Sequence, residues 1–291
     1  MPAEPSSPPV ANSLSESVRE GLARILDAGD LRMPMLPEVA RQLLSEEFRE
    51  KATAKTLSEL IHRDQMLAGQ VLRVSNSAAF NPGSPIVSLQ QAVVRMGLER
   101  IRELALAAAL ESGAFQVPGA KDLVLKLWMH SAAAGAFAKE VARARRANVE
   151  AAFLCGLFHD LGKPVVITAL FEFERKSGKR CAPEDWTAAL REFHVSAGLK
   201  LAERWALPES TREAIASHHL VESGAAAGEG ALTAALASAL SHWALEEGED
   251  PAAREALLRN PLWPKLDLYP ADAEIVLGKR ADALRFAEAF S

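Results

Sequence analysis

Apolar residues recur at helical spacings along almost the whole chain, and this pattern limits the fold more than any other feature of the sequence. The clearest stripe follows residue 120, with intervals of 4, 3, 4, 3 and 4 between its members: Leu123, Leu127, His130, Ala134, Phe137 and Val141. Such intervals place side chains on one face of an α-helix, whereas a half-buried strand needs strict alternation. No segment alternates in that way, and the one short strand candidate, residues 165–167, is too isolated to found a sheet. The sequence therefore predicts an all-α protein.

Breaks in the helical pattern divide the chain into four parts. These are a disordered lead (1–12), an N-terminal helical lobe (13–120), a second helical lobe packed against it (121–246), and a C-terminal linker with an appended helix (247–291). The lead has four prolines and few apolar side chains, so it cannot offset the entropy of ordering. Within the second lobe we expect separate helices at 184–191 and 194–206. The linker reads NPLWPKLDLYP, which we expect to dock through its aromatic residues, and the appended helix covers 271–289.

Charge and cysteine content exclude several classes of function. With 33 basic and 38 acidic residues the net charge is −5, which argues against broad attraction to nucleic acid or to an anionic membrane surface. The longest stretch without a charged residue, Gly230–Leu245, is shorter than the roughly 20 residues of a membrane span. The two cysteines, Cys155 and Cys181, stand in unrelated sequence contexts, which is typical of proteins from a reducing compartment. The N-terminus lacks the features of a secretory signal, so we expect a cytoplasmic protein.

Five of the seven histidines fall near the inward register of helices in the second half, together with one carboxylate. The members of this group are His130, His159, Asp160, His194, His218 and His219. Helical bundles build metal sites by aiming such side chains inward from separate helices. Imidazole and carboxylate together suit borderline divalent metals. A single buried histidine is more often a hydrogen-bonded core residue, so the prediction of a shared metal site rests on the group as a whole.

Two sets of motifs resemble a known family. Residues 157–163, LFHDLGK, are similar to the HD-x-GK signature of the HD superfamily of metal-dependent phosphohydrolases, and the order of the histidines along the chain matches its succession of ligand-bearing helices. Four segments of the first half resemble one branch, the HDOD proteins: 33–40 (MPMLPEVA), 61–64 (IHRD), 71–77 (VLRVSNS) and 88–98 (SLQQAVVRMGL). The resemblance covers roughly residues 30–245 and implies a helical lobe packed on an HD-like bundle.

The resemblance implies a role for each member of the group. The first histidine, the HD pair and a final aspartate would hold one divalent transition-metal ion, and the HD aspartate would bridge to a second ion. The implied ligands are His130, His159, Asp160, His194, His218 and His219. In a catalytic protein Asp160 and Lys163 would act on the substrate, with Lys163 meeting a phosphate oxygen. The helix expected to supply the final aspartate reads LASALS over 236–241, so Ser238 or a neighbour stands where a carboxylate is needed.

Three functions remain open at this point, of which the first is favoured. The family is mostly non-catalytic, which implies a signalling or regulatory module acting through a protein partner or a nucleotide-type ligand. The missing aspartate supports it, as does the absence after His219 of the glycine, tyrosine and proline that mark cyclic-dinucleotide phosphodiesterases of the superfamily. The alternative is a metal-dependent phosphohydrolase acting on a nucleotide or a cyclic dinucleotide. In the third, the histidine cluster only stabilises the bundle.

Overall fold

All the regular structure in the described residues is helical, as the sequence predicts. The computed structural model describes residues 14–27, 34–77, 80–81, 83–113, 117, 119–223, 227–248 and 250–289, and the lead at 1–12 lies outside them. The first half contains α1 (Glu16–Asp27), α2 (Glu38–Leu44), α3 (Glu46–Lys51), α4 (Ala54–His62), α5 (Gln65–Ser75), α6 (Leu89–Met96) and α7 (Leu98–Gly113). The second half contains α8 (Lys121–Arg145), α9 (Val149–Phe158), α10 (Lys163–Ser177), α11 (Pro183–Arg204), α12 (Glu209–Ser217), η1 (Leu220–Ser223), α13 (Glu229–His242), η2 (Trp243–Glu247), α14 (Pro251–Leu258), α15 (Leu262–Lys265), α16 (Pro270–Leu277) and α17 (Arg280–Glu288).

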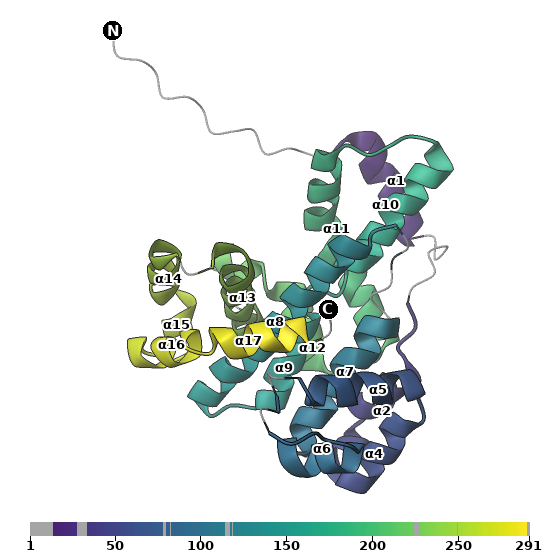
Figure 1. Ribbon diagram of the computed structural model, residues 1–291. Helices are drawn as coiled ribbons and strands as arrows, with labels where there is room; N and C mark the ends of the chain where they lie inside the picture. The colour runs from purple at the N-terminus through teal and green to yellow at the C-terminus, as the bar shows by residue number, and fades with distance from the viewer. Residues whose placement is uncertain are drawn as a thin grey trace.

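Helices α2–α7 form one lobe at an end of the molecule (Figure 1). Several of these helices begin where the side chain of Thr53, Asp64 or Ser88 accepts a hydrogen bond from the backbone N–H three residues later. Such caps satisfy donors that have no partner inside the helix. Helix α7 is buried along residues 104–110, because α2, α4, α5 and α6 pack around it.

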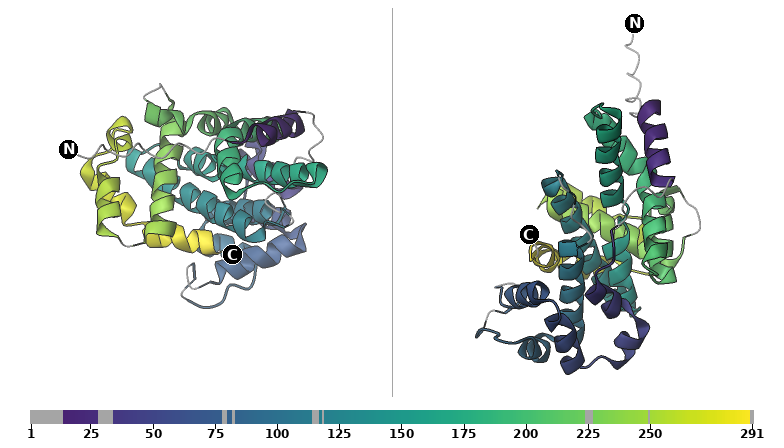
Figure 2. Two further views of the ribbon diagram at one scale, coloured as in Figure 1. Left: turned by 90° about the horizontal axis from the view of Figure 1, so that it is seen from above. Right: turned by 90° about the vertical axis from the view of Figure 1, so that its right-hand side faces the viewer.

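Helix α1 is separated from this lobe and packs on α10 and α11 of the second half (Figure 2). At Gly21 the ring of Phe173 fills the space that a β-carbon would take, so the two helices approach closely. Arg19 donates to Glu192 at 2.7 Å and Lys200 to Asp27 at 2.5 Å. Residues 14–27 are predicted as part of the first lobe (13–120), but in the structure they contact the second one.

The long helix α8 runs through the middle of the fold and is buried on most of its circumference over residues 130–138. It packs on α9, α13 and α17. Small residues allow this crowding: a β-carbon added to Gly156 would lie 2.5 Å from the carbonyl oxygen of Ala134, so α8 and α9 touch through their backbones. The sequence pattern predicts one apolar stripe on this helix, whereas the structure surrounds it with neighbours.

Two boundaries in the second half differ from the expected ones. Residues 183–204 form the single helix α11, because the two residues between the expected helices, Glu192 and Phe193, include no helix breaker. The expected helix over 271–289 is divided into α16 and α17 at Gly278 and Lys279. The linker also contains the short helix α15, and α14 precedes it. Its docking rests on Trp263, which is buried and donates its indole N–H to the Leu257 carbonyl, whereas Tyr269 is exposed.

One helical segment of the described residues, Val149–Ser177, is long and apolar enough to cross a membrane by composition alone. It comprises α9, α10 and the turn between them. Of its most apolar window, 89% is buried inside the protein. That burial is the property of core helices, and the turn between these two helices carries His159 and Asp160 of the candidate site.

Candidate metal centre

The turn between α9 and α10 positions the first residues of the site. Helix α9 ends at Phe158, and the backbone N–H of Lys163 donates to the carbonyl of Asp160 at 2.9 Å, so that α10 starts at once. Gly162 lies so close to α11 that a β-carbon on it would overlap the carbonyl oxygen of His194. The glycine of the motif thus lets α11 approach the turn, and this approach brings His194 to Asp160.

The five sequence-predicted histidine ligands gather around the buried carboxylate of the sixth, Asp160. His130 and His159 face one of its oxygens, with Nε2 to Oδ2 distances of 3.6 and 3.3 Å. We call His130, His159 and Asp160 the first set. Their ligand atoms all lie within 4.8 Å of one another, the reach of a single ion.

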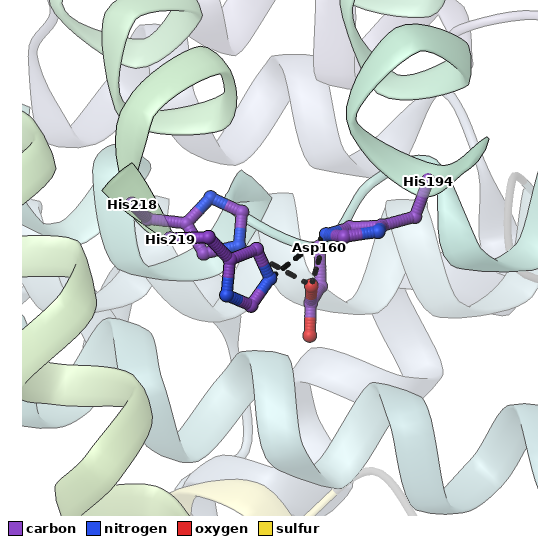
Figure 3. Close-up of side chains that lie close together, drawn as sticks. All are labelled: Asp160, His194, His218 and His219. Atoms are coloured by element: carbon purple, nitrogen blue, oxygen red, sulfur yellow. Dashed lines mark hydrogen bonds and ion pairs between the residues drawn. The ribbon is translucent and has the colours of Figure 1, made fainter. Parts of the chain in front are cut away.

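The second set faces the other oxygen of the same carboxylate (Figure 3). It consists of Asp160, His194, His218 and His219, whose ligand atoms also lie within 4.8 Å of one another. Nε2 of His194 and of His218 are 3.8 and 3.7 Å from Oδ1, and Nε2 of His219 is 3.0 Å from Nε2 of His194. His219 is exposed, so this set opens to solvent at one side.

Hydrogen bonds on the far side of the rings show which nitrogens carry protons. Nδ1 of His159 lies 2.7 Å from the carbonyl of Gly156, and Nδ1 of His218 lies 3.0 Å from that of Ala214. Because a carbonyl only accepts, both Nδ1 atoms are protonated, and in the neutral ring Nε2 keeps its lone pair. Metal-binding histidines are oriented by the same kind of contact.

Nδ1 of His130 is also protonated, and here the acceptor is the hydroxyl oxygen of Ser241. Ser241 donates its one proton to the carbonyl of Ser238 at 2.8 Å and must therefore accept from Nδ1 of His130, also at 2.8 Å. Nε2 of His130 and Nε2 of His159 then face each other at 3.1 Å with a lone pair on each. Two neutral acceptors make no hydrogen bond, and a cation bound between them turns this contact into an attraction.

The second set also has buried polar atoms without partners. Among the described residues, Oδ1 of Asp160 and Nε2 of His218 are buried and accept no hydrogen bond. Such atoms cost free energy unless a ligand satisfies them. Orphaned lone pairs on the facing atoms of both sets fit divalent metal ions, which supports the prediction of the site from sequence.

Burial in the cluster lowers the pKa of three of its histidines, whereas the carboxylate of Asp160 stays ionised. Burial lowers the pKa of His194 and the pKa of His219 to about 4, and burial with the neighbouring His159 lowers the pKa of His130 well below its usual value. Burial alone would raise the pKa of Asp160, but His159, His218 and Lys163 hold that pKa well below the usual range. At neutral pH the rings of His130, His194 and His219 are therefore neutral, and the carboxylate of Asp160 keeps its charge.

Lys163 and Ser238 occupy the remaining positions singled out in the sequence. The ammonium group of Lys163 forms an ion pair with Oδ2 of Asp160. The Ser238 hydroxyl from α13 lies 3.3 Å from Nε2 of His130, so a neutral oxygen stands beside the first set where the resemblance calls for a carboxylate. The first set is thus one ligand short.

One further histidine lies at the site, and sequence reasoning missed it. The ring of His242 is 4.3 Å from the ring of His130, centroid to centroid. The available signal was its position four residues after Ser238, which places the two side chains on the same face of α13.

Comparison with solved structures places the chain among proteins with the HD-like helical fold. A protein from Shewanella amazonensis SB2B, provisionally named a metal-dependent phosphohydrolase, superposes with a TM-score of 0.68 at 21% identity over 95% of this chain and all of that one. An HDOD domain protein of unknown function from Geobacter sulfurreducens gives 0.68 at 21% identity over 95% and 98% of the two chains. A protein from Marinobacter aquaeolei VT8, provisionally named a signal transduction protein, gives 0.64 at 20% identity over 94% and 65%.

Sequence comparison identifies the family within this class. The profile of the HDOD domain matches residues 33–221, and the chain therefore belongs to the HDOD domain family. An uncharacterized protein of Treponema pallidum (strain Nichols) is 30% identical over 169 residues, which are 55% of this chain. The matched region spans about a third of that relative, 32% of its length.

Proposed function

We propose that the chain is a regulatory, signal-transducing HDOD module with a metal centre and little or no hydrolytic turnover. The observation that carries the proposal is that the two sets differ in their number of protein ligands. The second set offers four protein ligands to one ion, whereas the first set offers three and has Ser238 beside it in place of a carboxylate. A full protein shell is typical of a structural ion, and the first set lacks the carboxylate that the resemblance calls for in a catalytic protein.

The donor atoms also indicate which ions would bind. The second set comprises three imidazoles and one carboxylate, a combination suited to zinc, iron, cobalt or nickel and poorly suited to magnesium. Asp160 belongs to both sets, so occupancy of one set affects the charge that the other can use. We infer that one or two divalent transition-metal ions are the cofactor.

The signal itself would pass through a bound partner. We propose either a signalling protein or a nucleotide-type ligand, without involvement of nucleic acid or of a membrane. The cytoplasm is the proposed compartment, and Cys155 and Cys181 are free thiols.

A metal-dependent phosphohydrolase is the second candidate, and one feature favours it. Asp160 belongs to both sets, and the ammonium group of Lys163 beside it could contact a phosphoryl oxygen. A bound ion would supply the Lewis acidity that phosphoester hydrolysis needs. In the structure, however, the Lys163 ammonium group is paired with Asp160.

Elemental analysis of tag-free protein, purified without chelator, tests the first proposal. We expect near-stoichiometric transition metal in the wild type, its loss from the second set in His194→Ala/His218→Ala, and full retention in His62→Ala, which removes an exposed histidine on α4. Absence of metal from the wild type would refute the metal centre.

A screen with nucleotides and cyclic dinucleotides, run on the metal-loaded protein, separates the two functions. The regulatory proposal predicts no useful turnover. Hydrolysis that disappears in Asp160→Ala while the helical circular dichroism is kept would establish the enzyme instead.

A further inference from the structure

The first set lacks a fourth ligand, and the helix that should supply it is in place. Helix α13 passes the cluster with two serines facing His130: the Ser238 hydroxyl lies 3.3 Å from Nε2, and that of Ser241 lies 2.8 Å from Nδ1. Ser241 orients the ring, as a residue behind a metal ligand does. Ser238 is a weak ligand for a divalent cation, so the set still needs a stronger donor.

His242 is the nearest donor from the same helix. It follows Ser238 by one helical turn, and its ring lies 4.3 Å from that of His130 with 43° between the ring planes. Its side chain is 50% exposed. Solvent on one side leaves the ring room to turn toward the first set, a freedom that the buried histidines lack.

A carboxylate lies beside the His242 ring. Nδ1 of His242 is 3.5 Å from Oε1 of Glu246. A carboxylate behind an imidazole fixes the proton on the near nitrogen, raises the basicity of the other nitrogen, and is a common partner of metal-bound histidine. Position 238 has no carboxylate, but the carboxylate of Glu246 supplies a negative charge next to His242.

The backbone changes form at this point of α13. The helix passes into the π-helical turn η2 directly after His242, and such turns are frequent at functional sites. Arg280 of α17 holds the turn, because it donates to the Ala244 carbonyl at 3.1 Å and lies over the Trp243 ring. The C-terminal segment thus fixes the part of the chain that carries His242.

We propose that His242, positioned by Glu246, completes the first set and enables it to hold a second metal ion. This inference rests on the proposed metal centre and adds a ligand to it. The completed set comprises His130, His159, His242 and the shared Asp160. Three imidazoles with one shared carboxylate favour cobalt, nickel, copper or zinc over manganese or magnesium, so we expect the second ion to be a late transition metal.

Titration of the metal-free protein with Co²⁺ alone, followed by visible absorption and by elemental analysis after gel filtration, tests this assignment. We expect two Co²⁺ ions per chain in the wild type and in His62→Ala. His242→Ala should bind one ion tightly and the second at least tenfold more weakly. Adding Ser238→Asp to His242→Ala should restore the second ion, because it returns a carboxylate to α13 beside His130.

The position of Glu246 is tested separately. Glu246→Gln should weaken the second ion by about 10- to 100-fold, the range found when a residue behind a metal ligand is removed. Glu246→Asp should recover part of that loss. Equal affinity in all three proteins would show that Glu246 does not position His242.

The outcomes distinguish this inference from the proposed function. Two ions bound with unchanged affinity and spectrum in His242→Ala would overturn it. One ion in the wild type, lost only on mutation of His194 and His218, would overturn it as well and leave the proposed metal centre intact. No Co²⁺ in the wild type would refute both.

Discussion

Replacement of Gly162 by alanine tests how the turn after Asp160 is built. The backbone of Gly162 has φ −77° and ψ −19°, which alanine adopts without strain. The cost is therefore steric. The new methyl group would overlap the carbonyl oxygen of His194 and lie 2.5 Å from the backbone nitrogen of Gly198, where ordinary contacts begin at 3.4 Å. Both atoms belong to the backbone of α11, so the whole helix must shift.

The magnitude follows from the nature of these neighbours. Overpacking a core costs about 1–3 kcal/mol when side chains can adjust. Because backbone atoms are the obstacle here, we expect Gly162→Ala to lower the free energy of unfolding by about 3 kcal/mol. Helix α11 also carries His194, whose Nε2 lies 3.8 Å from Oδ1 of Asp160. A shift of α11 widens this distance and should weaken binding of the ion at the second set at least tenfold.

Urea unfolding of the metal-free protein, followed by circular dichroism, measures the first effect, and Co²⁺ titration measures the second. Gly69→Ala on α5 is the matched control, since no atom lies within 4 Å of the added methyl group. That change should stabilise the protein by about 0.5–1 kcal/mol, because alanine favours a helix interior. A loss below about 1 kcal/mol for Gly162→Ala, or unchanged Co²⁺ affinity, would refute the reasoning.

Three further predictions concern charge. Glu150→Gln should lower the unfolding free energy by about 2–4 kcal/mol in thermal melts, because it removes one of the carboxylates that pair with the buried guanidinium of Arg102. Lys163→Met should destabilise the metal-free protein and raise its Co²⁺ affinity in titrations, because a cation leaves Asp160. Metal-free protein should lose stability as pH falls from about 6.5 to about 4. Burial lowers the pKa of His194 to about 4, so the unfolded chain binds protons first; at about 1.4 kcal/mol per pKa unit this residue alone accounts for about 3 kcal/mol.

The first of these predictions has a matched control, and each has an outcome that contradicts it. The control is Glu59→Gln, which breaks an exposed ion pair with Lys55 and should change the unfolding free energy by less than about 0.5 kcal/mol. If Glu150→Gln changed the unfolding free energy by no more than this control, the first prediction would be contradicted. Weaker Co²⁺ binding by Lys163→Met would show that the lysine does not oppose the ion. A flat stability profile between pH 6.5 and 4 would contradict the buried, neutral state of His194.

The helices could be predicted where the local pattern decides them. The stripe through His130 predicts α8, and the cap at Ser88 and the break at Gly97 bound α6, because periodic burial and capping involve residues within a few positions of each other. Residues 183–204 are expected as two helices but form one, because Glu192 and Phe193 between them include no helix breaker and the helix continues through them. The place of α1 against α10 depends on the contact of Gly21 with Phe173, which no periodicity encodes.

The candidate site, too, could be predicted only in part from the sequence. The types and order of its ligands, from His130 to His219, are visible in the sequence, and so is the lack of a carboxylate at Ser238. Their separation into two sets on the two oxygens of Asp160 is not visible. It depends on how α8, α11 and α12 approach the turn, as does the position of His242, which only the packing of α13 against α8 reveals.

The sequence by itself determines the helical class, the family and the chemistry of the donor atoms, because each depends on residue types and short spacings. Only the tertiary structure decides which lone pairs face each other and which oxygens have no partner. Those contacts join residues far apart in the chain, such as Ser241 and His130 at a separation of 111, or His194 and His219 at 25. Their distances are set by backbone contacts between helices, at Gly156 and Gly162 above all, and such contacts form only when the whole bundle packs.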